Sequence, residues 1–443
     1  MEFGSWAIIN PPSLLALIPL LVMIILAMKG HSTTAACSVG IIVAALLMGQ
    51  NVKLLGAAFQ KSLSSSTAFI SVIIMIGSGL GVLMTEAKIT QTLVYWIVKG
   101  IGVNTQAKGK AALLVSSVLS CGLLGTMGGG NSVIAPIMIP ILANLGITPS
   151  VAAVLFKIGG EMGLVLGPLT GVTLITMEVT GLSYGELMVG AAIPFAVFFI
   201  GGAWFSTIRT QKRTEGKERY VISEDMKDIS SIVVSPREKM NAIIFLCSFL
   251  LLIVYGIITK QGTSYALMVM IILSIIIGIT NRISIDNVVK YLTKGVASQA
   301  GMLLMFISID VLLTMVTGAG GFEALSGLLG GLVGNSPTAV MLIASVVGGF
   351  GIEAAAVAEI KIIAEMFLGV ATTADLPMTM FAISIIAATR ITGSMYPTSN
   401  FAIALGVAQC DNTKEVLRAL WAACASVCAF ILVWAFVGVW ILT

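Results

Sequence analysis

The chain has 443 residues, of which 58% are hydrophobic and only 10% are charged. Because a soluble protein carries about a quarter charged residues, this composition excludes an ordinary soluble domain. The hydrophobicity also lacks the weak alternation of a transmembrane β-barrel, so we predict an all-α polytopic membrane protein in the lipid bilayer. The net charge of +4 comes with no basic cluster interleaved with aromatic residues, and we expect no nucleic-acid partner.

The residue types of enzyme active sites are largely missing. A single histidine, His31, leaves no plausible Ser/His/Asp triad and argues against zinc or haem chemistry. No glycine-rich loop followed by Lys-Ser or Lys-Thr is present, which argues against ATP hydrolysis. The six cysteines are scattered through apolar segments, and we interpret Cys424 and Cys428, which share a helical face, as small buried thiols in preference to a metal-binding pair. We therefore expect neither an enzyme nor a cofactor.

The first half of the chain is a series of apolar runs. The first twelve residues have no basic region and no cleavage site, so we expect the first run to be a permanent span. Runs of spanning length lie near 14–28, 35–48, 68–98, 111–126, 151–167 and 187–208.

A charged segment divides the chain at its middle. Residues 209–239 contain Arg209, Lys212 and further basic residues, and basic loops stay in the cytoplasm. We predict a first inverted repeat at 1–208, a cytoplasmic linker at 209–239 and a second inverted repeat at 240–443. In the second half, apolar runs lie near 242–258, 265–279, 302–316, 338–347, 354–368, 378–388 and 417–442.

The two halves repeat the same features in the same order. A polar and apolar stretch from Asn51 to Ser62 has a counterpart from Ile285 to Lys294. An odd number of crossings in each half would invert the halves, and the loops at Lys29, Lys108 and Lys414 would then all lie inside. On this register Gly128 matches Gly351, Asn131 matches Ala354, Glu161 matches Arg390, Pro168 matches Pro397, and Thr170 matches Ser399.

Each half contains two breaks in its apolar runs. The first half has Gly125–Ser132, which includes three consecutive glycines, and then Gly167–Gly171. Non-helical backbone at membrane depth is tolerated only where it is buried in protein or lines a wet cavity. We predict re-entrant hairpins at 111–145 and 338–368, with tips at the glycine run and at 348–353. The helices at 151–181 and 378–410 are expected to unwind at Pro168 and Pro397.

Such breaks can bind ions. Half-helix N-termini favour an anion, while free carbonyls and hydroxyls coordinate Na⁺. The alternative is that these residues only serve helix packing, but their recurrence as paired clusters favours binding. The available oxygens are those of Thr126, Asn131, Ser132, Thr170 and Thr173 in the first half, and of Ser394, Thr398, Ser399 and Asn400 in the second.

Ionisable residues within the apolar runs are functional candidates, because burying a charge in a membrane is costly. Lys157 and Glu161 are four residues apart and can neutralise each other. Arg390 either pairs with Glu161 across the molecule or holds a substrate carboxylate with its guanidinium. Glu161, Asp310 and Glu353 are candidates for proton coupling. A paired or hydrated stripe on one helix is expected from Glu359, Lys361 and Glu365.

Short motifs follow one another in a recognisable order. They are Gly125–Ser132, Ile137–Pro140, Leu145-Gly146, Gly167-Pro168, Ser183–Leu187 and Ile193-Pro194, and more loosely Gly348–Glu353, Leu368-Gly369 and Gly393–Asn400. This order resembles the ion transporter superfamily. Its relatives include the large membrane subunit of tripartite (TRAP) carboxylate transporters, the citrate–metal symporters and the dicarboxylate/sodium symporters.

The resemblance implies an inverted-repeat fold with a scaffold and a mobile, elevator-type transport domain, often in a homodimer. It implies that each hairpin tip and the unwound helix of its own half bind a cation, with substrate between the tips. The implied cation ligands are Thr126, Asn131, Ser132, Thr170, Gly171, Thr173, Gly351, Glu353, Ala354, Thr398, Ser399 and Asn400. The implied substrate ligands are Gly129, Gly130, Asn131, Ser132, Gly351, Ile352, Glu353, Arg390, Tyr396 and Thr398.

We therefore predict a secondary transporter, coupled to Na⁺ or H⁺, for a small organic anion such as a di- or tricarboxylate. Its place would be a bacterial or archaeal cytoplasmic membrane. The carboxylate of Glu353, where symporters of this group usually have small polar residues, admits H⁺ coupling. One alternative is a Na⁺/H⁺ antiporter of the same superfamily, which the buried acids would favour. Another is the membrane subunit of a tripartite transporter that requires a periplasmic binding protein.

Overall fold

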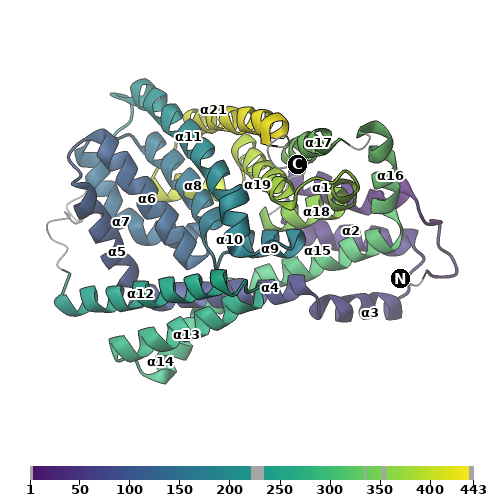
Figure 1. Cartoon of the computed structure of the whole chain (residues 1–443), viewed down its shortest axis with the longest axis horizontal. Helices are drawn as coiled ribbons and strands as arrows, with labels where there is room; N and C mark the ends of the chain where they lie inside the picture. Colours follow the sequence, from purple (N-terminus) through teal and green to yellow (C-terminus); the bar gives the residue numbers. More distant parts are fainter. Residues whose placement is uncertain (1–2, 221–233, 334–335, 352–355, 439–443) are drawn as a thin grey trace.

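The computed structural model describes residues 3–220, 234–333, 336–351 and 356–438, and over these residues it is helical with no strand (Figure 1). In this described part of the chain, nine helices are long and apolar enough to cross a membrane. The predicted all-α polytopic membrane protein is thus confirmed.

The first half folds into helices that follow the predicted apolar runs, except that the run predicted at 68–98 is divided into two helices between Glu86 and Ile89. Its last span, Tyr184–Thr214, starts at a capping box in which Ser183 and Glu186 satisfy each other's backbone N–H groups. In chain order the elements are η1 (Leu14–Leu17), α1 (Ile18–Met28), α2 (Thr33–Leu47), α3 (Val52–Leu63), α4 (Ser66–Glu86), α5 (Ile89–Ile101), α6 (Gln106–Leu124), α7 (Met127–Asn144), α8 (Pro149–Leu166), α9 (Gly171–Thr180), α10 (Tyr184–Leu187), η2 (Met188–Ala192) and α11 (Ile193–Thr214).

The second half begins after the charged segment. Its first helix also starts at a capping box, here made by Ser235 and Glu238. The elements are α12 (Pro236–Ile258), α13 (Ser264–Asn281), α14 (Ile285–Ser298), α15 (Ala300–Gly318), α16 (Gly321–Val333), α17 (Pro337–Gly351), α18 (Ala356–Thr373), α19 (Met378–Met395), α20 (Ser399–Val407), α21 (Thr413–Val433) and η4 (Trp434–Gly438).

Helices α6 and α7 form the first hairpin, but its turn differs from the prediction. The chain reverses at Gly125, whose φ of +69° suits glycine, and at Thr126, which caps α7. The predicted glycine tip is wrong in this detail, since Gly128 and Gly129 already belong to the first turn of α7. Gly130 lets the two limbs approach closely, because an added Cβ would lie 2.7 Å from the backbone of Cys121.

Helices α17 and α18 occupy the place of the second predicted hairpin. Helix α17 ends at Gly351 and α18 begins at Ala356. The predictions made for Ile352, Glu353 and Ala354 fall outside the described residues.

Both predicted helix interruptions are confirmed. The first separates α8 from α9 at residues 167–170, and the second separates α19 from α20 at residues 396–398. Each interruption contains its predicted proline, Pro168 or Pro397. Proline has no N–H to donate and restricts the residue before it, so the helical hydrogen bonds stop there.

The interrupted helices lie at the centre of the fold. In α8 and α19, 94% and 83% of the apolar segment is buried inside the protein, compared with 22% in α12. Figure 1 shows α12 and α13 along the lower edge and α8 and α19 in the middle. At the first interruption Gly167, Leu169 and Thr170 are buried, as unpaired peptide groups in a membrane require, whereas Pro397 at the second interruption is exposed.

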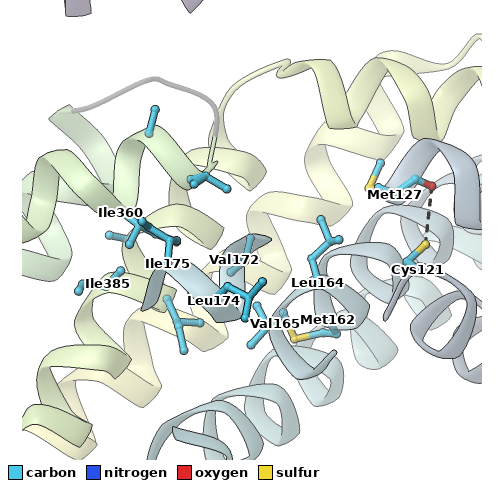
Figure 2. Packing of buried hydrophobic residues seen from close by; sticks show 14 of the residues in the cluster. Cys121, Met127, Met162, Leu164, Val165, Val172, Leu174, Ile175, Ile360 and Ile385 are labelled. Atoms are coloured by element: carbon cyan, nitrogen blue, oxygen red, sulfur yellow. Dashed lines mark hydrogen bonds between the residues drawn. The ribbon is translucent and has the colours of Figure 1, made fainter. Parts of the chain in front are cut away.

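Apolar side chains from both halves meet beside the first interruption (Figure 2). They come from the end of α8, from α9, and from α18 and α19 of the second half. The labelled residues from these helices are Met162, Leu164, Val165, Val172, Leu174, Ile175, Ile360 and Ile385, and the labelled Cys121 and Met127 belong to the first hairpin. This packing holds the beginning of α9 against the second half of the chain.

Candidate functional site

A cavity of about 290 Å³ lies where the two halves meet near the interruptions. Its walls come from the first hairpin, from α4, from the end of α8, and from α9, α15, α18 and α20. The described lining residues are Ile74, Gly125, Thr126, Met127, Gly128, Gly129, Leu164, Gly171, Val172, Gln299, Met302, Met305, Ala356, Val357, Ser399, Asn400 and Ile403. We call it the tip cavity. It brings five of the predicted site residues together: Thr126, Gly129, Gly171, Ser399 and Asn400.

Helix N-termini converge on the tip cavity. In the described part of the chain, α7, α9, α15, α18 and α20 all have their first residues in or next to its wall. The hydroxyl of Thr126 accepts from the N–H of Gly129 at 3.3 Å, and that of Thr398 accepts from Phe401 at 3.4 Å. The remaining first-turn N–H groups and the helix dipoles create a positive potential without any charged side chain in the described lining. This arrangement favours an anion.

Oxygen atoms crowd together at the interruption between α8 and α9. The Thr173 hydroxyl lies 3.0 Å from the Val165 carbonyl, 3.2 Å from the Leu164 carbonyl and 3.1 Å from the Thr170 hydroxyl. Thr170 in turn donates to the carbonyls of Leu164 and Gly167. We call these two hydroxyls and three carbonyls the threonine cluster.

The chemistry of the threonine cluster suits a hard monovalent cation. Thr170 and Thr173 are buried, and their two hydroxyl protons cannot serve all the neighbouring oxygens at once. All five groups are neutral oxygen ligands, which hard cations prefer. Leu164 belongs to the cluster and also lines the tip cavity, so the two features adjoin.

Asn131 is turned away from the tip cavity. Its side chain is fully buried, accepts from the Ser117 hydroxyl at 2.6 Å and donates to the Phe156 carbonyl at 2.9 Å. These bonds join α7 to α6 and α8. Its neighbour Ser132 is exposed and is not among the lining residues.

Arg390 lies in a buried group of charges between α8 and α19. Its Nη1 is 3.6 Å from Oε1 of Glu161, and the same oxygen is 2.5 Å from Nζ of Lys157. The three side chains are at most 2% exposed. Gly393 makes room for them, because an added Cβ would lie 2.8 Å from the Glu161 carboxylate. Arg390 is absent from the described lining of the tip cavity. Of the two roles considered for it, its position agrees with pairing to Glu161 and not with binding a substrate carboxylate.

The second interruption contributes differently from the first. Ser399 and Asn400 line the tip cavity, whereas Thr398 caps α20 and the Tyr396 hydroxyl donates to the Phe350 carbonyl at 3.1 Å. The bond from Tyr396 ties the interruption to the end of α17, where the predicted site residue Gly351 lies exposed. The Ser394 hydroxyl is buried without a hydrogen-bond partner among the described residues.

The remaining charged candidates lie elsewhere. Asp310 faces another cavity. Of the predicted stripe, Lys361 pairs with Glu365 at 3.7 Å, as the helical spacing predicts, whereas Glu359 is buried against α19, where its carboxylate accepts from the Thr392 hydroxyl at 2.7 Å. Within the described residues, no group of three or more His, Cys, Asp or Glu side chains could hold a metal ion.

Sequence reasoning missed the start of α15 as part of the site. Gln299, Met302 and Met305 line the tip cavity, although no motif marks them. The available signal was the polar Gln299 between an amphipathic stretch and an apolar run, where α14 ends and α15 begins. That signal indicates a bend between two helices, but it does not indicate that the residues at the bend line a cavity.

Comparisons with known proteins agree with the fold. The family described as "Tripartite ATP-independent periplasmic transporter, DctM component" matches residues 13–440. The structure of Neisseria gonorrhoeae MtrF, which represents a class of antimetabolite efflux pumps, is similar with a TM-score of 0.64 and 15% identity. That similarity covers 98% of this chain and 96% of MtrF.

A second solved structure, the Alcanivorax borkumensis YdaH transporter, is similar with a TM-score of 0.58 and 16% identity, and the similarity covers 87% of each chain. At such identities the likeness to both structures concerns the fold alone. No curated protein sequence matches the chain.

The family match confirms the transporter superfamily that the motifs resemble and the location in a membrane. DctM is the large membrane component of a tripartite transporter that works with a periplasmic binding protein. The alternative of a tripartite membrane subunit thus agrees with the match. Because the match extends over nearly the whole length, the chain belongs to the DctM family of tripartite ATP-independent periplasmic transporters.

Proposed function

We propose that this chain carries a small organic anion across the membrane and that it draws on a Na⁺ gradient to do so. The observation that carries the proposal is the convergence of helix N-termini on the tip cavity. An anion released by the periplasmic binding protein would enter this cavity, bind there, and leave on the other side of the membrane.

The lining of the tip cavity matches a carboxylate attached to a short carbon skeleton. First-turn N–H groups and the polar side chains of Thr126, Gln299 and Asn400 can donate to carboxylate oxygens. Met302 and Ile403 offer apolar contact to the carbon atoms. No acidic side chain among the described lining residues would repel the anion.

The threonine cluster supports Na⁺ as the coupling ion. A cation bound there would replace the hydroxyl protons as the partner of the crowded carbonyls and would fix the start of α9. Because Gly171 and Val172 at that start line the tip cavity, cation binding would shape the anion site. It would also place a positive charge beside the anion, so each ligand would strengthen binding of the other.

The same cluster favours a symporter over a Na⁺/H⁺ antiporter. An antiporter needs a group that exchanges a proton for the metal ion at one site. The threonine cluster consists of hydroxyls and carbonyls, and none of them titrates in the physiological range. Glu161 lies in an ion pair with Lys157 instead.

Reciprocal contacts support the inverted repeat. Helix α3 packs on α15 while α14 packs on α4, and α2 contacts α15 while α13 contacts α4. Similarly, α7 contacts α20, and α18 contacts α9. In each case the second contact is the first one with every helix replaced by its counterpart in the other half. The counterparts are α2 and α13, α3 and α14, α4 and α15, α7 and α18, and α9 and α20. We propose that the hairpins and interrupted helices move together against the remaining helices, in an elevator motion. The homodimer stays a prediction.

The proposal is tested by uptake into liposomes that contain the complete tripartite assembly. The probes are labelled mono-, di- and tricarboxylates offered with the binding protein under a Na⁺ gradient, a H⁺ gradient or neither. We expect Na⁺-driven uptake of at least one carboxylate. Uptake driven by H⁺ alone, or no carboxylate uptake under any gradient, would contradict the proposal.

Two variants separate the cation site from the anion site. Thr173→Val removes a cluster hydroxyl while keeping the side-chain shape, and we expect about a tenfold or greater rise in the Na⁺ concentration for half-maximal uptake. Asn400→Ala should instead raise the carboxylate concentration for half-maximal uptake. Ser132→Ala, at an exposed position outside the tip cavity, is the matched control and should change neither value.

A further inference from the structure

A groove of about 740 Å³ lies in the angle between α13 and α14, with Ile76 of α4 at its side. We call it the corner groove. Figure 1 shows α13 and α14 at the lower edge of the molecule. Most of the described lining residues are isoleucine, valine or leucine, and Arg282 is the only charged one among them. Small-molecule sites typically measure about 300–1,000 Å³, so the groove is large enough to hold a ligand.

The C-terminal part of α14 packs closely on α4, whereas its N-terminal part leaves the groove open. A Cβ added to Gly295 would lie 2.5 Å from the backbone of Gly79 in α4. At the floor of the groove, a Cβ added to Gly278 of α13 would lie 3.0 Å from a side chain of α14. Nearer the turn between the two helices, Ile279 and Ile285 are 72% and 82% exposed. The corner groove therefore has protein on its inner side and opens outward.

The two helices place the corner groove at the edge of the membrane. Helix α13 is a candidate membrane span in which only 39% of the apolar segment is buried inside the protein. Helix α14 is amphipathic, because its groove-lining residues at 285, 288, 289 and 292 have the spacing of one helical face. The exposed Asp286, Lys290 and Lys294 lie outside the described lining. Amphipathic helices of this kind lie along the membrane–water interface, where acyl chains meet lipid headgroups.

Arg282 lies at the turn between α13 and α14, at one end of the groove. It is exposed, and among the described residues its guanidinium has no ion pair and no hydrogen bond. Its backbone φ of +55° is uncommon for a residue other than glycine, so the conformation of the turn does not explain an arginine here. A guanidinium can donate two parallel hydrogen bonds to a phosphate. The end of the apolar groove is therefore suited to an anionic group.

The corner groove lies on the side of the membrane at which the charged segment ends. The Asn241 amide, near the beginning of α12, donates to Asn281 at the end of α13 at 2.7 Å, so these two helix ends are at the same level. The basic residues of the charged segment predict that this is the cytoplasmic side. The cytoplasmic leaflet has the negative surface potential of anionic lipids.

We propose that the corner groove binds an anionic phospholipid. One acyl chain packs along the apolar wall of α13 and α14, and the lipid phosphate accepts hydrogen bonds from the Arg282 guanidinium. Charge complementarity selects this occupant, because an apolar helix of another protein would leave Arg282 without an acceptor. On the polar face of α14, Lys290 and Lys294 outnumber Asp286 and favour a headgroup of net negative charge over a zwitterionic one. The bound lipid holds the N-terminal part of α14 against α13.

Photocrosslinking in the complete tripartite assembly tests the site. The probe is phosphatidylglycerol with a diazirine on one acyl chain, and crosslinked peptides are identified by mass spectrometry. We expect crosslinks to residues 271–292. Unlabelled phosphatidylglycerol should compete about fivefold better than phosphatidylcholine with the same chains, which corresponds to the attraction between one basic residue and an anionic headgroup. Equal competition by the two lipids, or no crosslink to residues 271–292, would overturn the proposal.

Substitution of Arg282 tests the headgroup contact. Arg282→Ala should retain the crosslink but lose the preference for phosphatidylglycerol, whereas Arg282→Lys should keep a preference because the charge remains. The matched control is Arg209→Ala, which removes another exposed arginine that has no ion pair among the described residues. This control should keep the wild-type preference. A wild-type preference in Arg282→Ala would contradict the assignment of the phosphate to the guanidinium.

A bulky side chain in the groove tests the acyl-chain contact. Val289→Trp, at a lining position that is 52% exposed, should abolish the crosslink because the indole ring takes the space of the acyl chain. Leu251→Trp, at a 71% exposed position of α12 outside the described lining, is the control and should retain it. Crosslinks that form with the isolated chain but are lost in the complete assembly would show that another subunit covers the groove. That result would also overturn the lipid site.

Discussion

At the scale of single residues, the burial and partners of a charged side chain indicate whether it stabilises the fold or is free to bind a ligand. Arg390 has a fork suited to a carboxylate, but it is 1% exposed and its nearby carboxylate belongs to Glu161. Lys157 shares the same oxygen, so one acid lies between two bases. Removal of one member of a buried ion pair is strongly destabilising, because the remaining charge loses its compensation.

The first prediction concerns this group. We expect Arg390→Ala to lower the stability of the protein by about 3–5 kcal/mol, measured as a lower midpoint of thermal unfolding in detergent. Asn400→Ala should reduce carboxylate binding with little effect on that midpoint. If Arg390→Ala unfolds like the wild type yet no longer binds carboxylate, the guanidinium is a substrate ligand after all.

At the scale of elements, the first hairpin depends on Asn131. Its amide binds a hydroxyl of α6 and a carbonyl of α8, and Gly130 allows the limbs to meet. The motif around these residues was sufficient to predict a hairpin, since three glycines followed by Asn-Ser do not suit a lipid-facing helix. It was not sufficient to locate the turn, because glycine is tolerated both in a turn and in the first turn of a helix, where the N–H groups have no partner within the helix.

The second prediction distinguishes a packing role of Asn131 from a cation-binding role. Asn131→Ala leaves the buried Ser117 hydroxyl and Phe156 carbonyl with fewer partners, at a cost of about 1–3 kcal/mol for each unsatisfied group. We expect faster hydrogen exchange in α7 with or without Na⁺. A variant that keeps wild-type exchange without Na⁺ but binds Na⁺ more weakly would show that Asn131 is a cation ligand.

At the scale of the whole molecule, residues at the start of the charged segment connect the two halves. The Glu218 carboxylate accepts from the Ser150 hydroxyl at 2.9 Å, at the start of α8, and from the Asn412 amide at 2.6 Å, just before α21. Nearby, Arg213 pairs with Glu415 at 2.7 Å. The predicted linker therefore does more than join two repeats, since its first residues bind an element of each.

The third prediction follows from these contacts. Glu218→Ala removes hydrogen bonds from both halves, and we expect a loss of about 1.5–3 kcal/mol in stability, measured by thermal unfolding. Lys212→Ala is the matched control, because Lys212 is exposed on α11. Equal unfolding midpoints for Glu218→Ala and the wild type would contradict a joining role.

The sequence by itself determined the class of protein, the helices and the interruptions. Hydrophobicity is summed along the chain, and glycine and proline act on their own backbone, so these features are readable locally. The tertiary structure decided which candidates meet. It brought Thr126, Gly171 and Asn400 to the wall of one cavity, turned Asn131 into the hairpin, paired Arg390 with Glu161 and left Asp310 facing another cavity. Those outcomes depend on contacts between helices far apart in the chain, and no local pattern specifies them.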